Sequence, residues 1–225
     1  YRILDTLGRE FPDVDIEACS GGGARVDLGM AARTAQFWVS DNTDPFDRLF
    51  IQEGYTLMYA PMMMSCWVTD TPKDGHKRGR DDWHYKFHAA MCGTLGIGAD
   101  ISKLSDEEME LFSEEIARYK TWRDVVQNGD LYRLQLPSCS NVAAVEYVSK
   151  DQNETVLFLF MHSRKYGEVL PRVKMHGLKE DAHYSCDETG KVCAGKTMMN
   201  LGLSVGLHGD FDSRVYHFQA VKLKS

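Results

Sequence analysis

The sequence predicts an α/β part followed by an antiparallel β part, and two patterns along the chain support this expectation. Up to about residue 125, short β-rich runs alternate with helical patterns, which is typical of βα units that build a parallel sheet. From about residue 130, apolar and polar residues alternate with a period of two between turn-forming residues, which is typical of antiparallel strands. The 225 residues are 43% hydrophobic, so the chain is long enough and apolar enough to bury a core.

The α/β part is expected to begin with a helix over residues 2–11 and to contain four short strands. The β-rich runs that predict these strands are residues 14–19, 36–40, 56–60 and 95–99. Four parallel strands leave an open edge and two faces to cover, so the sheet is either doubly wound or half of a barrel.

Three further helices are expected between and after these strands. Asp44 is an acidic N-cap before a proline at N1, and it begins a helix over residues 45–53. A second helical stretch covers residues 83–91. The segment Ser105-Asp-Glu-Glu is a capping box for a longer helix that reaches about residue 126.

The second part is expected to form a small antiparallel sandwich. Cys186 and Cys193 flank a hairpin-like turn that can place their sulfurs opposite each other, either as a disulfide or as two free thiols. The six cysteines have no C-x-x-C spacing, so most are expected to be reduced, which favours a cytoplasmic location. The predicted strands are residues 131–136, 142–149, 155–160, 168–175, 182–185 and 214–221.

Charge and hydropathy argue against two classes of partner. The formal net charge is -7 at pH 7, which disfavours a general role in coating phosphate backbones. No apolar run approaches the roughly 18 to 20 residues that a membrane-spanning helix needs. We therefore expect neither nucleic acid nor a membrane as a partner.

The first candidate site residues lie where barrel enzymes hold their catalytic groups, at the carboxyl ends of the strands. After the first predicted strand, Cys19 is followed closely by Gly21, Gly22 and Gly23, whose backbone lets a ligand approach. A turn without a ligand explains these glycines equally well. Trp67 is expected to follow a strand end, where its ring can offer an aromatic face to a sugar.

Two acids follow the second predicted strand. Asp44 already has a structural role as an N-cap, whereas Asp41 has no such local role and is the better candidate for a general acid or base. Arg25, Asp27 and Arg48 form either a charge network around Asp41 or ordinary ion pairs at the loop rims.

Neither a metal nor a cofactor is expected. His84 and His88 have the i, i+4 spacing of helical zinc ligands, but they lack a carboxylate partner at the expected place. The eight histidines show no H-E-x-x-H pattern.

Distinctive segments run through the whole chain. They include Cys19-Ser-Gly-Gly-Gly-Ala-Arg-Val-Asp-Leu-Gly29, Trp38-Val-Ser-Asp-Asn-Thr-Asp44, Trp67-Val-Thr-Asp-Thr-Pro72, Leu95-Gly-Ile-Gly98 and Gly209-Asp-Phe-Asp-Ser-Arg214. In these segments the sequence resembles the family 36 glycoside hydrolases, the α-galactosidase group. The resemblance implies that residues 1–127 are the second half of a (β/α)8 TIM barrel, with the four predicted strands as its fifth to eighth. Residues 128–225 would then be a C-terminal antiparallel β-sandwich domain.

The resemblance also implies an activity. Members of the family release terminal α-linked galactose by double displacement with retention, using one aspartate as nucleophile and another as general acid/base. Asp41 matches the acid/base position, and Cys19 with the glycines around Gly22 matches the sugar-binding loop. The family's nucleophile lies in a Lys-x-Asp context on an earlier strand, and nothing of that kind precedes Cys19.

This chain alone is therefore expected to be an incomplete and inactive portion of an enzyme. The expected partners are the remainder of the parent chain, α-galactoside oligosaccharides of the melibiose or raffinose type, and further copies in a homo-oligomer. Two alternatives stay open. One is an α-N-acetylgalactosaminidase or a raffinose-synthase-like transglycosylase, because the loop at Cys19 faces the part of the sugar where those substrates differ. The other is a non-catalytic carbohydrate-binding or structural fragment.

Overall fold

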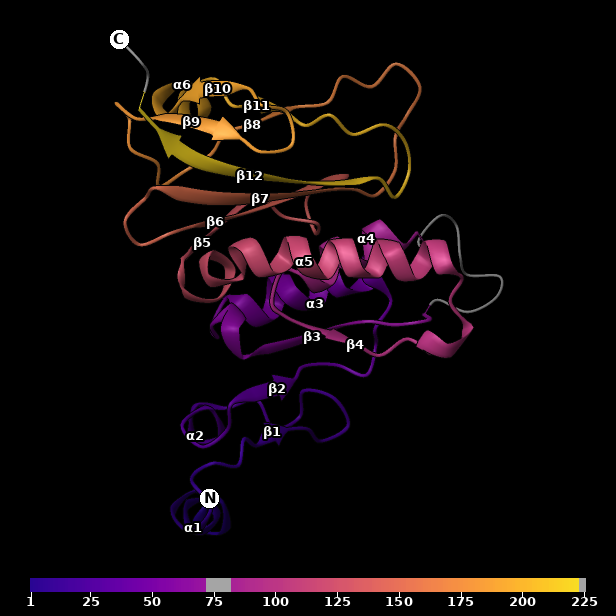
Figure 1. The fold of residues 1–225 in the computed structure, drawn as a ribbon, viewed down its shortest axis with the longest axis vertical. Helices are drawn as coiled ribbons and strands as arrows, with labels where there is room; N and C mark the ends of the chain where they lie inside the picture. The colour runs from indigo at the N-terminus through magenta and orange to yellow at the C-terminus, as the bar shows by residue number, and fades with distance from the viewer. Residues whose placement is uncertain (72–81, 223–225) are drawn as a thin grey trace.

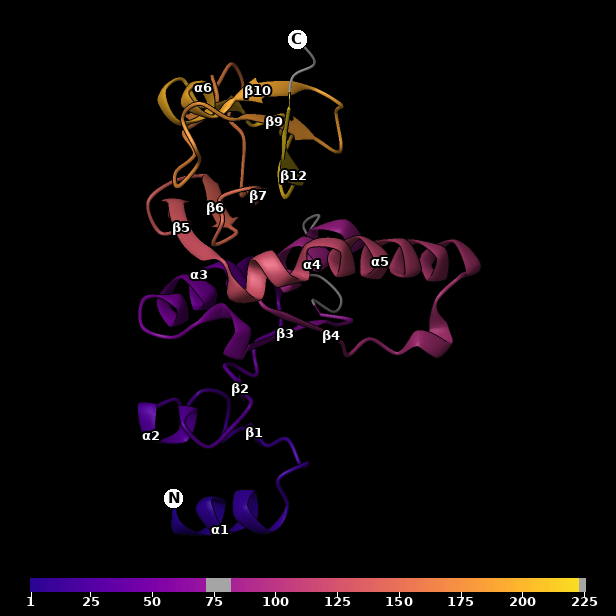
Figure 2. The same ribbon diagram turned by 60° about the vertical axis from the view of Figure 1, so that its left-hand side comes forward.

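The computed structural model describes residues 1–71 and 82–222, and it stacks them in layers (Figure 1). The N-terminus lies at one end of the molecule and the antiparallel sheets lie at the other. Figure 2 shows helices α4 and α5 between the parallel strands and the large antiparallel sheet. The α/β and antiparallel β parts that the sequence predicts are both present.

The first part contains a four-stranded sheet in which every neighbouring pair is parallel, as predicted. The strands follow one another in chain order across the sheet, so each connection returns to the same end. Their bounds are β1 (Glu17–Ala18), β2 (Gln36–Trp38), β3 (Met64–Val68) and β4 (Thr94–Ile97).

The third strand lies further along the chain than the predicted segment 56–60, so that prediction is wrong. Thr56 is the last residue of helix α3 (Pro45–Thr56), and Pro61–Met63 form a short 3-10 helix. The ring of Tyr55 packs edge-on against Phe37 of β2, with centroids 6.5 Å apart. This tertiary contact anchors the end of the helix, and residues 57–60 form the turn that follows it, despite their β-prone side chains.

The predicted helix starts are confirmed. Asp44 Oδ1 accepts hydrogen bonds from the backbone N–H groups of Phe46 and Asp47, which caps α3. The Ser105 and Glu108 side chains form the reciprocal capping box of α5 (Asp106–Asn128). Two other predicted helices are α1 (Arg2–Glu10) and α4 (Trp83–Ala90), while the short α2 (Leu28–Ala31) and the 3-10 turn Ile101–Lys103 were not predicted.

The second part is built on a six-stranded sheet in which all pairs are antiparallel. The order across it is β10-β9-β12-β7-β6-β5. Its strands are β5 (Asp130–Gln135), β6 (Val142–Val148), β7 (Glu154–Met161), β9 (His183–Cys186), β10 (Val192–Ala194) and β12 (Ser213–Val221).

The layer on the far side of this sheet is smaller than the predicted sandwich. Of the predicted strand 168–175, only β8 (Arg172–Val173) forms, and it pairs with β11 (Leu203–Ser204). Together with helix α6 (Gly195–Asn200), this two-stranded sheet covers the second face. The segment 168–175 therefore crosses the sheet as a covering loop with one short bridge.

Strands β6 and β7 are buried on both faces, which joins the two parts of the chain. On one face Phe158 meets the ring of Trp122 from α5, with centroids 5.5 Å apart. Tyr147 on the same face donates a hydrogen bond of 2.6 Å to the carbonyl oxygen of Cys92. The predicted domain boundary after residue 127 lies in the last turn of α5, and this core continues across it. The opposite face belongs to a second core with Val142, Ala144, Leu157, Leu159, Met175, Leu178 and Met198.

All six cysteines lie among the described residues and are free thiols. In the β9–β10 hairpin, Cys193 pairs with Tyr184, and Cys186 donates its backbone N–H to Lys191. The two sulfurs of Cys186 and Cys193 are therefore on diagonal rather than directly opposite positions. Among residues 1–71 and 82–222, no helix has the length and apolar character to cross a membrane.

Glu146 in β6 is a carboxyl group buried completely within the second part. Its Oε1 accepts a hydrogen bond of 3.0 Å from the Thr155 hydroxyl, and its Oε2 accepts one of 2.7 Å from the backbone N–H of His176. Burial raises the pKa of Glu146 to about 8, and the two hydrogen bonds oppose that rise. The folded protein therefore keeps this carboxyl protonated at neutral pH.

The substitution Glu146→Gln should remove a pH-dependent loss of stability. The unfolded chain releases this proton near the ordinary pKa of 4.5, so the stabilisation is complete below that pH and is lost as the pH rises toward 8. Glutamine mimics the protonated form, and each pKa unit corresponds to about 1.4 kcal/mol. Urea unfolding should show that, between about pH 5 and pH 8, the free energy of unfolding of the variant rises relative to that of the wild type by a few kcal/mol.

The matched control is Glu110→Gln, because Glu110 is exposed on α5. It should follow the wild-type pH dependence. If Glu146→Gln also follows it, the buried carboxyl does not hold its proton in the folded state.

Candidate active site

The candidate site lies at the carboxyl ends of β1 to β4. Because these strands are parallel, the segments that leave their carboxyl ends meet at one edge of the sheet. The glycine loop follows β1, and Ser40 and Asp41 follow β2. Trp67 and Gly98 come from β3 and the segment after β4.

Gly22 brings the loop after β1 directly onto the end of β2. Its φ is +79°, and a Cβ at this position would lie 3.1 Å from Ser40 Cα and 3.2 Å from Asp41 N. A Cβ on the neighbouring Gly23 would lie only 2.6 Å from the carbonyl oxygen of Val39. The run of glycines is therefore required for close packing of two backbones beside Asp41.

Asp41 is exposed, and the indole of Trp38 holds its carboxylate. Trp38 Nε1 donates a hydrogen bond of 2.8 Å to Asp41 Oδ1. Trp38 is the last residue of β2, so the donor is fixed by the sheet. A carboxylate held by a rigid donor at a strand end has a defined direction, which is what a group that transfers protons to a bound substrate needs.

Trp67 lies inside β3 and not after a strand end, which corrects the sequence prediction. Its ring is 41% exposed and meets the Trp38 ring edge-on, with centroids 4.8 Å apart. The same ring lies over Gly96 and Gly98, where an added Cβ would come within 2.6 Å of its atoms. The two glycines therefore make the space in which this indole lies.

The structure brings most of the predicted site residues together. Gly22, Asp41 and Trp67 form one series of contacts through Trp38 and the end of β2. Cys19 and Gly21 are exposed on the same loop after β1. These residues share a short edge of the sheet, although they are widely separated in the sequence.

Arg48 and Asp27 do not form the predicted charge network around Asp41. Arg48 is buried, and its guanidinium donates hydrogen bonds of 3.1 Å to the carbonyl oxygen of Ser65 and to the sulfur of Cys66. Asp27 accepts hydrogen bonds from the N–H of Met30 and the hydroxyl of Tyr1, and so it caps α2. Both side chains support the fold through these hydrogen bonds, and not as the ion pairs at the loop rims that were the alternative interpretation.

Sequence reasoning missed a group of hydroxyls beside the site. Thr69, just after β3, donates to the hydroxyl of Thr43 at 2.9 Å, and Thr43 donates to that of Thr71 at 3.1 Å. They were missed because β3 was placed too early in the chain. Asp100, beyond β4, accepts hydrogen bonds from Lys103 and Ser102 that lower its pKa to about 2, which makes it a poor proton donor.

The comparisons with known proteins agree with this architecture. The melibiase family matches residues 1–129, and the glycosyl hydrolase family 36 C-terminal domain matches residues 142–218. The chain is 39% identical to a probable α-galactosidase G of Aspergillus terreus and 38% identical to the α-galactosidase Mel36A of Lactobacillus acidophilus. These alignments cover 96% and 98% of this chain but only 30% of each relative.

A solved structure shows the same relation. It is that of a doubly substituted variant of the family 36 α-galactosidase AgaA from Geobacillus stearothermophilus in complex with raffinose, with a TM-score of 0.93 and 33% identity. The match covers 98% of this chain and 31% of that protein. The chain thus spans about a third of the length of the relatives it matches, and it belongs to the melibiase family of glycosyl hydrolases.

Proposed function

We propose that this chain is a portion of a retaining α-galactosidase in which Asp41 is the general acid/base. The observation that carries the proposal is the position of Asp41 at the carboxyl end of a parallel strand, held by the Trp38 indole and packed against the glycine loop. Its relatives are named α-galactosidases, and this supports the reaction class.

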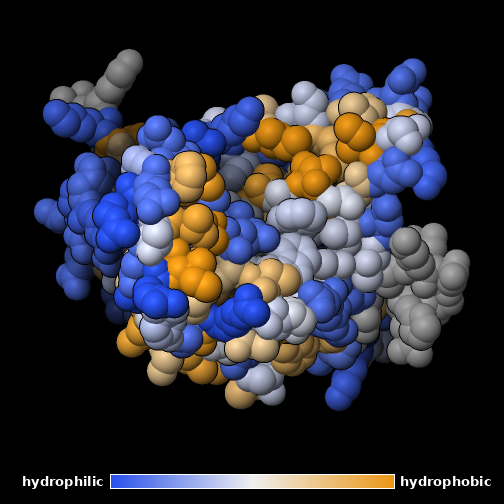
Figure 3. Space-filling view, turned by 90° about the horizontal axis from the view of Figure 1, so that it is seen from below, coloured by the Kyte–Doolittle hydropathy of each residue, from blue (hydrophilic) through white to orange (hydrophobic). Residues whose placement is uncertain are grey.

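The proposed parent fold is a (β/α)8 barrel, of which β1 to β4 are the second half. Supporting this, the four strands are parallel and follow one another in order. Helix α1 buries none of its residues. Ile3 of α1 and Leu28 of α2 are 71% and 70% exposed. Figure 3 views the molecule from the end where α1 and β1 lie, and it shows hydrophobic side chains in patches among the polar ones. The remaining strands of the parent protein would cover such surfaces and close the sheet.

In the proposed mechanism, the carboxyl group of Asp41 donates its proton to the glycosidic oxygen of the leaving group. A carboxylate from the remainder of the parent chain, roughly 5 to 5.5 Å away, attacks the anomeric carbon and forms a covalent galactosyl intermediate. The Asp41 carboxylate then removes a proton from water, which attacks the anomeric carbon and releases galactose. Two carboxyl groups so close together favour protonation of one of them.

The same edge would bind the sugar. The exposed face of Trp67 offers an apolar surface to the C–H groups of a sugar ring. Gly22 lies against the backbone of Asp41, and Cys19 and Gly21 are exposed on the same loop, where a side chain and backbone groups can recognise sugar hydroxyls. The proposed substrates are oligosaccharides with terminal α-linked galactose of the melibiose or raffinose type, in line with the relative that binds raffinose.

Replacing Asp41 by asparagine in the complete protein should affect two substrates very differently. Raffinose has a poor leaving group that needs a proton donor, so its kcat/KM should fall by about 10²- to 10⁴-fold. Formation of the intermediate from p-nitrophenyl α-galactoside needs little protonation and should fall much less. Azide needs no general base, so it should restore turnover of the aryl substrate and yield α-galactosyl azide.

The matched control is Asp44→Asn, because asparagine also caps helices and should leave activity near that of the wild type. Equal losses on raffinose and the aryl galactoside, without azide rescue, would contradict the acid/base role of Asp41.

Replacing Gly22 by alanine should impair the site more than replacing Gly21. Both residues have a positive φ, so both variants carry similar backbone strain. Only at Gly22 would the new Cβ press on Ser40 and Asp41, since nothing lies within 4 Å of a Cβ at Gly21. We expect a larger fall in kcat/KM for Gly22→Ala in steady-state assays of the complete protein. A greater loss for Gly21→Ala would mean that the loop does not position Asp41.

A further inference from the structure

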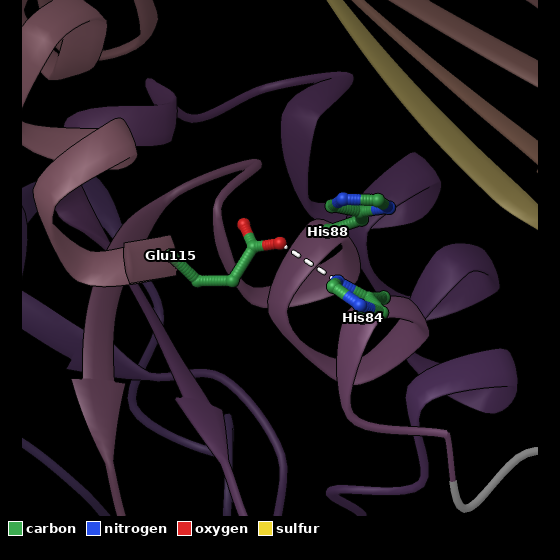
Figure 4. A group of neighbouring side chains, drawn as sticks. All are labelled: His84, His88 and Glu115. Atoms are coloured by element: carbon green, nitrogen blue, oxygen red, sulfur yellow. Dashed lines mark hydrogen bonds and ion pairs between the residues drawn. The ribbon is translucent and has the colours of Figure 1, made fainter. Parts of the chain in front are cut away.

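Helices α4 and α5 bring two histidines and a glutamate together outside the proposed active site. Figure 4 shows His84 and His88 on successive turns of α4, with Glu115 of α5 opposite them. His84 Nδ1 lies 2.8 Å from Glu115 Oε1. One nitrogen of each imidazole and one carboxylate oxygen all lie within 4.8 Å of one another.

Two atoms of this cluster are buried without a hydrogen bond. His88 and Glu115 are 4% and 6% exposed. Within the described residues His88 Nε2 has no hydrogen-bond partner, and Glu115 Oε2 has none either, although it forms a long ion pair of 3.8 Å with Arg118. Buried polar atoms are rarely left without a partner, because burial removes the hydrogen bonds that they would make to water. An imidazole nitrogen and a carboxylate oxygen are also two of the atoms that divalent transition metals prefer.

The orientation of His88 fits a metal ligand. Its other ring nitrogen, Nδ1, is 2.7 Å from the hydroxyl oxygen of Ser213 in β12. Metal-binding histidines usually make such a hydrogen bond through the second nitrogen, which fixes the tautomer and directs the first nitrogen to the ion. Here that bond also joins the cluster to the antiparallel sheet.

Solvent reaches the cluster from one side. His84, which is exposed, lines a hollow of about 590 Å³ together with Asp82, Ser213 and Arg214. The hollow gives an ion a route to the cluster and leaves room for water to complete its coordination.

Among the described residues, two arginines beside the cluster are paired with carboxylates. Arg118 Nη1 is 3.8 Å from Glu115 Oε2, and Arg118 Nη2 donates to the Glu188 carboxylate at 2.7 Å and to the Val215 carbonyl at 2.6 Å. Arg214 pairs with Asp212 at 3.0 Å. The carboxylates of Glu188 and Asp212 therefore offset part of the positive charge that these two arginines bring to the cluster.

We propose that His84, His88 and Glu115 bind one zinc ion, with water as a further ligand. Two imidazoles and a carboxylate are a common ligand set for Zn²⁺, and the exposed His84 side chain has the freedom to bring its nitrogen to bonding distance. The sequence predicted no metal site because the carboxylate was sought near the two histidines in sequence, whereas it comes from the next helix. The ion would connect α4, α5 and, through Ser213, β12.

The proposal is tested on the complete protein, freed of any affinity tag and stripped of metal by a chelator. Zn²⁺ is titrated by calorimetry, and Co²⁺ is added as a spectroscopic substitute. The wild type should bind Zn²⁺ with a dissociation constant of about 1 μM or lower and should melt at a higher temperature when zinc is present. Four-coordinate Co²⁺ should give a visible absorption band.

His84→Ala and Glu115→Gln are the informative variants, because the exposed His84 adds little to the core and glutamine keeps the shape of Glu115. Each should bind one ion fewer per chain, lose the Co²⁺ band and lose the zinc-dependent rise in melting temperature. Ser213→Ala should weaken binding by about 10- to 100-fold, as expected for an outer contact. His208→Ala is the matched control, because the exposed His208 lines the same hollow without belonging to the cluster.

Two results would overturn the proposal. One is a wild-type protein without saturable zinc binding or a cobalt band. The other is unchanged binding in His84→Ala and Glu115→Gln, or a loss confined to His208→Ala, which would place the ion elsewhere.

Discussion

Burial of β6 and β7 on both faces is the constraint on which the rest of the structure depends. Most antiparallel sheets have one face in solvent, so their strands alternate between apolar and polar residues. Here the run Val156-Leu-Phe-Leu-Phe160 is apolar at every position, and alternate residues enter different cores. One core needs helices α4 and α5, and the other needs the segment that contains β8, α6 and β11. Neither face can be exposed without leaving large apolar side chains in water.

This constraint also explains how the candidate site is supported. The helices that pack on β6 and β7 are those that follow β3 and β4. The antiparallel sheet therefore supports the parallel strands through these two helices. Tyr147 and Tyr119 show this coupling, since their hydroxyls donate to the carbonyl oxygens of Cys92 and Gly93, just before β4. The groups at the carboxyl ends of the strands are thus carried by a well-packed layer rather than by loops alone.

Features that depend on neighbouring residues could be predicted from the sequence, and features that depend on distant contacts could not. The caps at Asp44 and Ser105 act within three residues, so their signals are local. The end of α3 depends on the packing of Tyr55 against Phe37, and the β-prone residues that follow gave the wrong strand. The short elements β8, β11 and α6 exist because the sheet must be covered, and their own residues carry little signal.

The candidate site also combines features that local sequence predicts with features that depend on distant contacts. Asp41 could be found from its place after a strand. The glycines beneath Trp67 could not be found, because that contact joins separate strands. The donor Trp38 lies only three residues before Asp41, but no sequence pattern marks an indole as a hydrogen-bond donor. Glu115 illustrates the point again, since 31 residues separate it from His84. Side chains from different helices can share a site without any pattern in the sequence.

The position of β12 has a consequence for the order in which the second part folds. This strand comes after all the others in the sequence, yet it lies between β7 and β9 and pairs with both. Until β12 is in place, the β9–β10 hairpin has no edge to join, and β7 exposes an unpaired apolar edge. Completion of the sheet therefore requires a strand to insert between two earlier ones, over a long sequence separation. Such non-local pairing is slow, and chains caught before that step present an edge to which other chains can add.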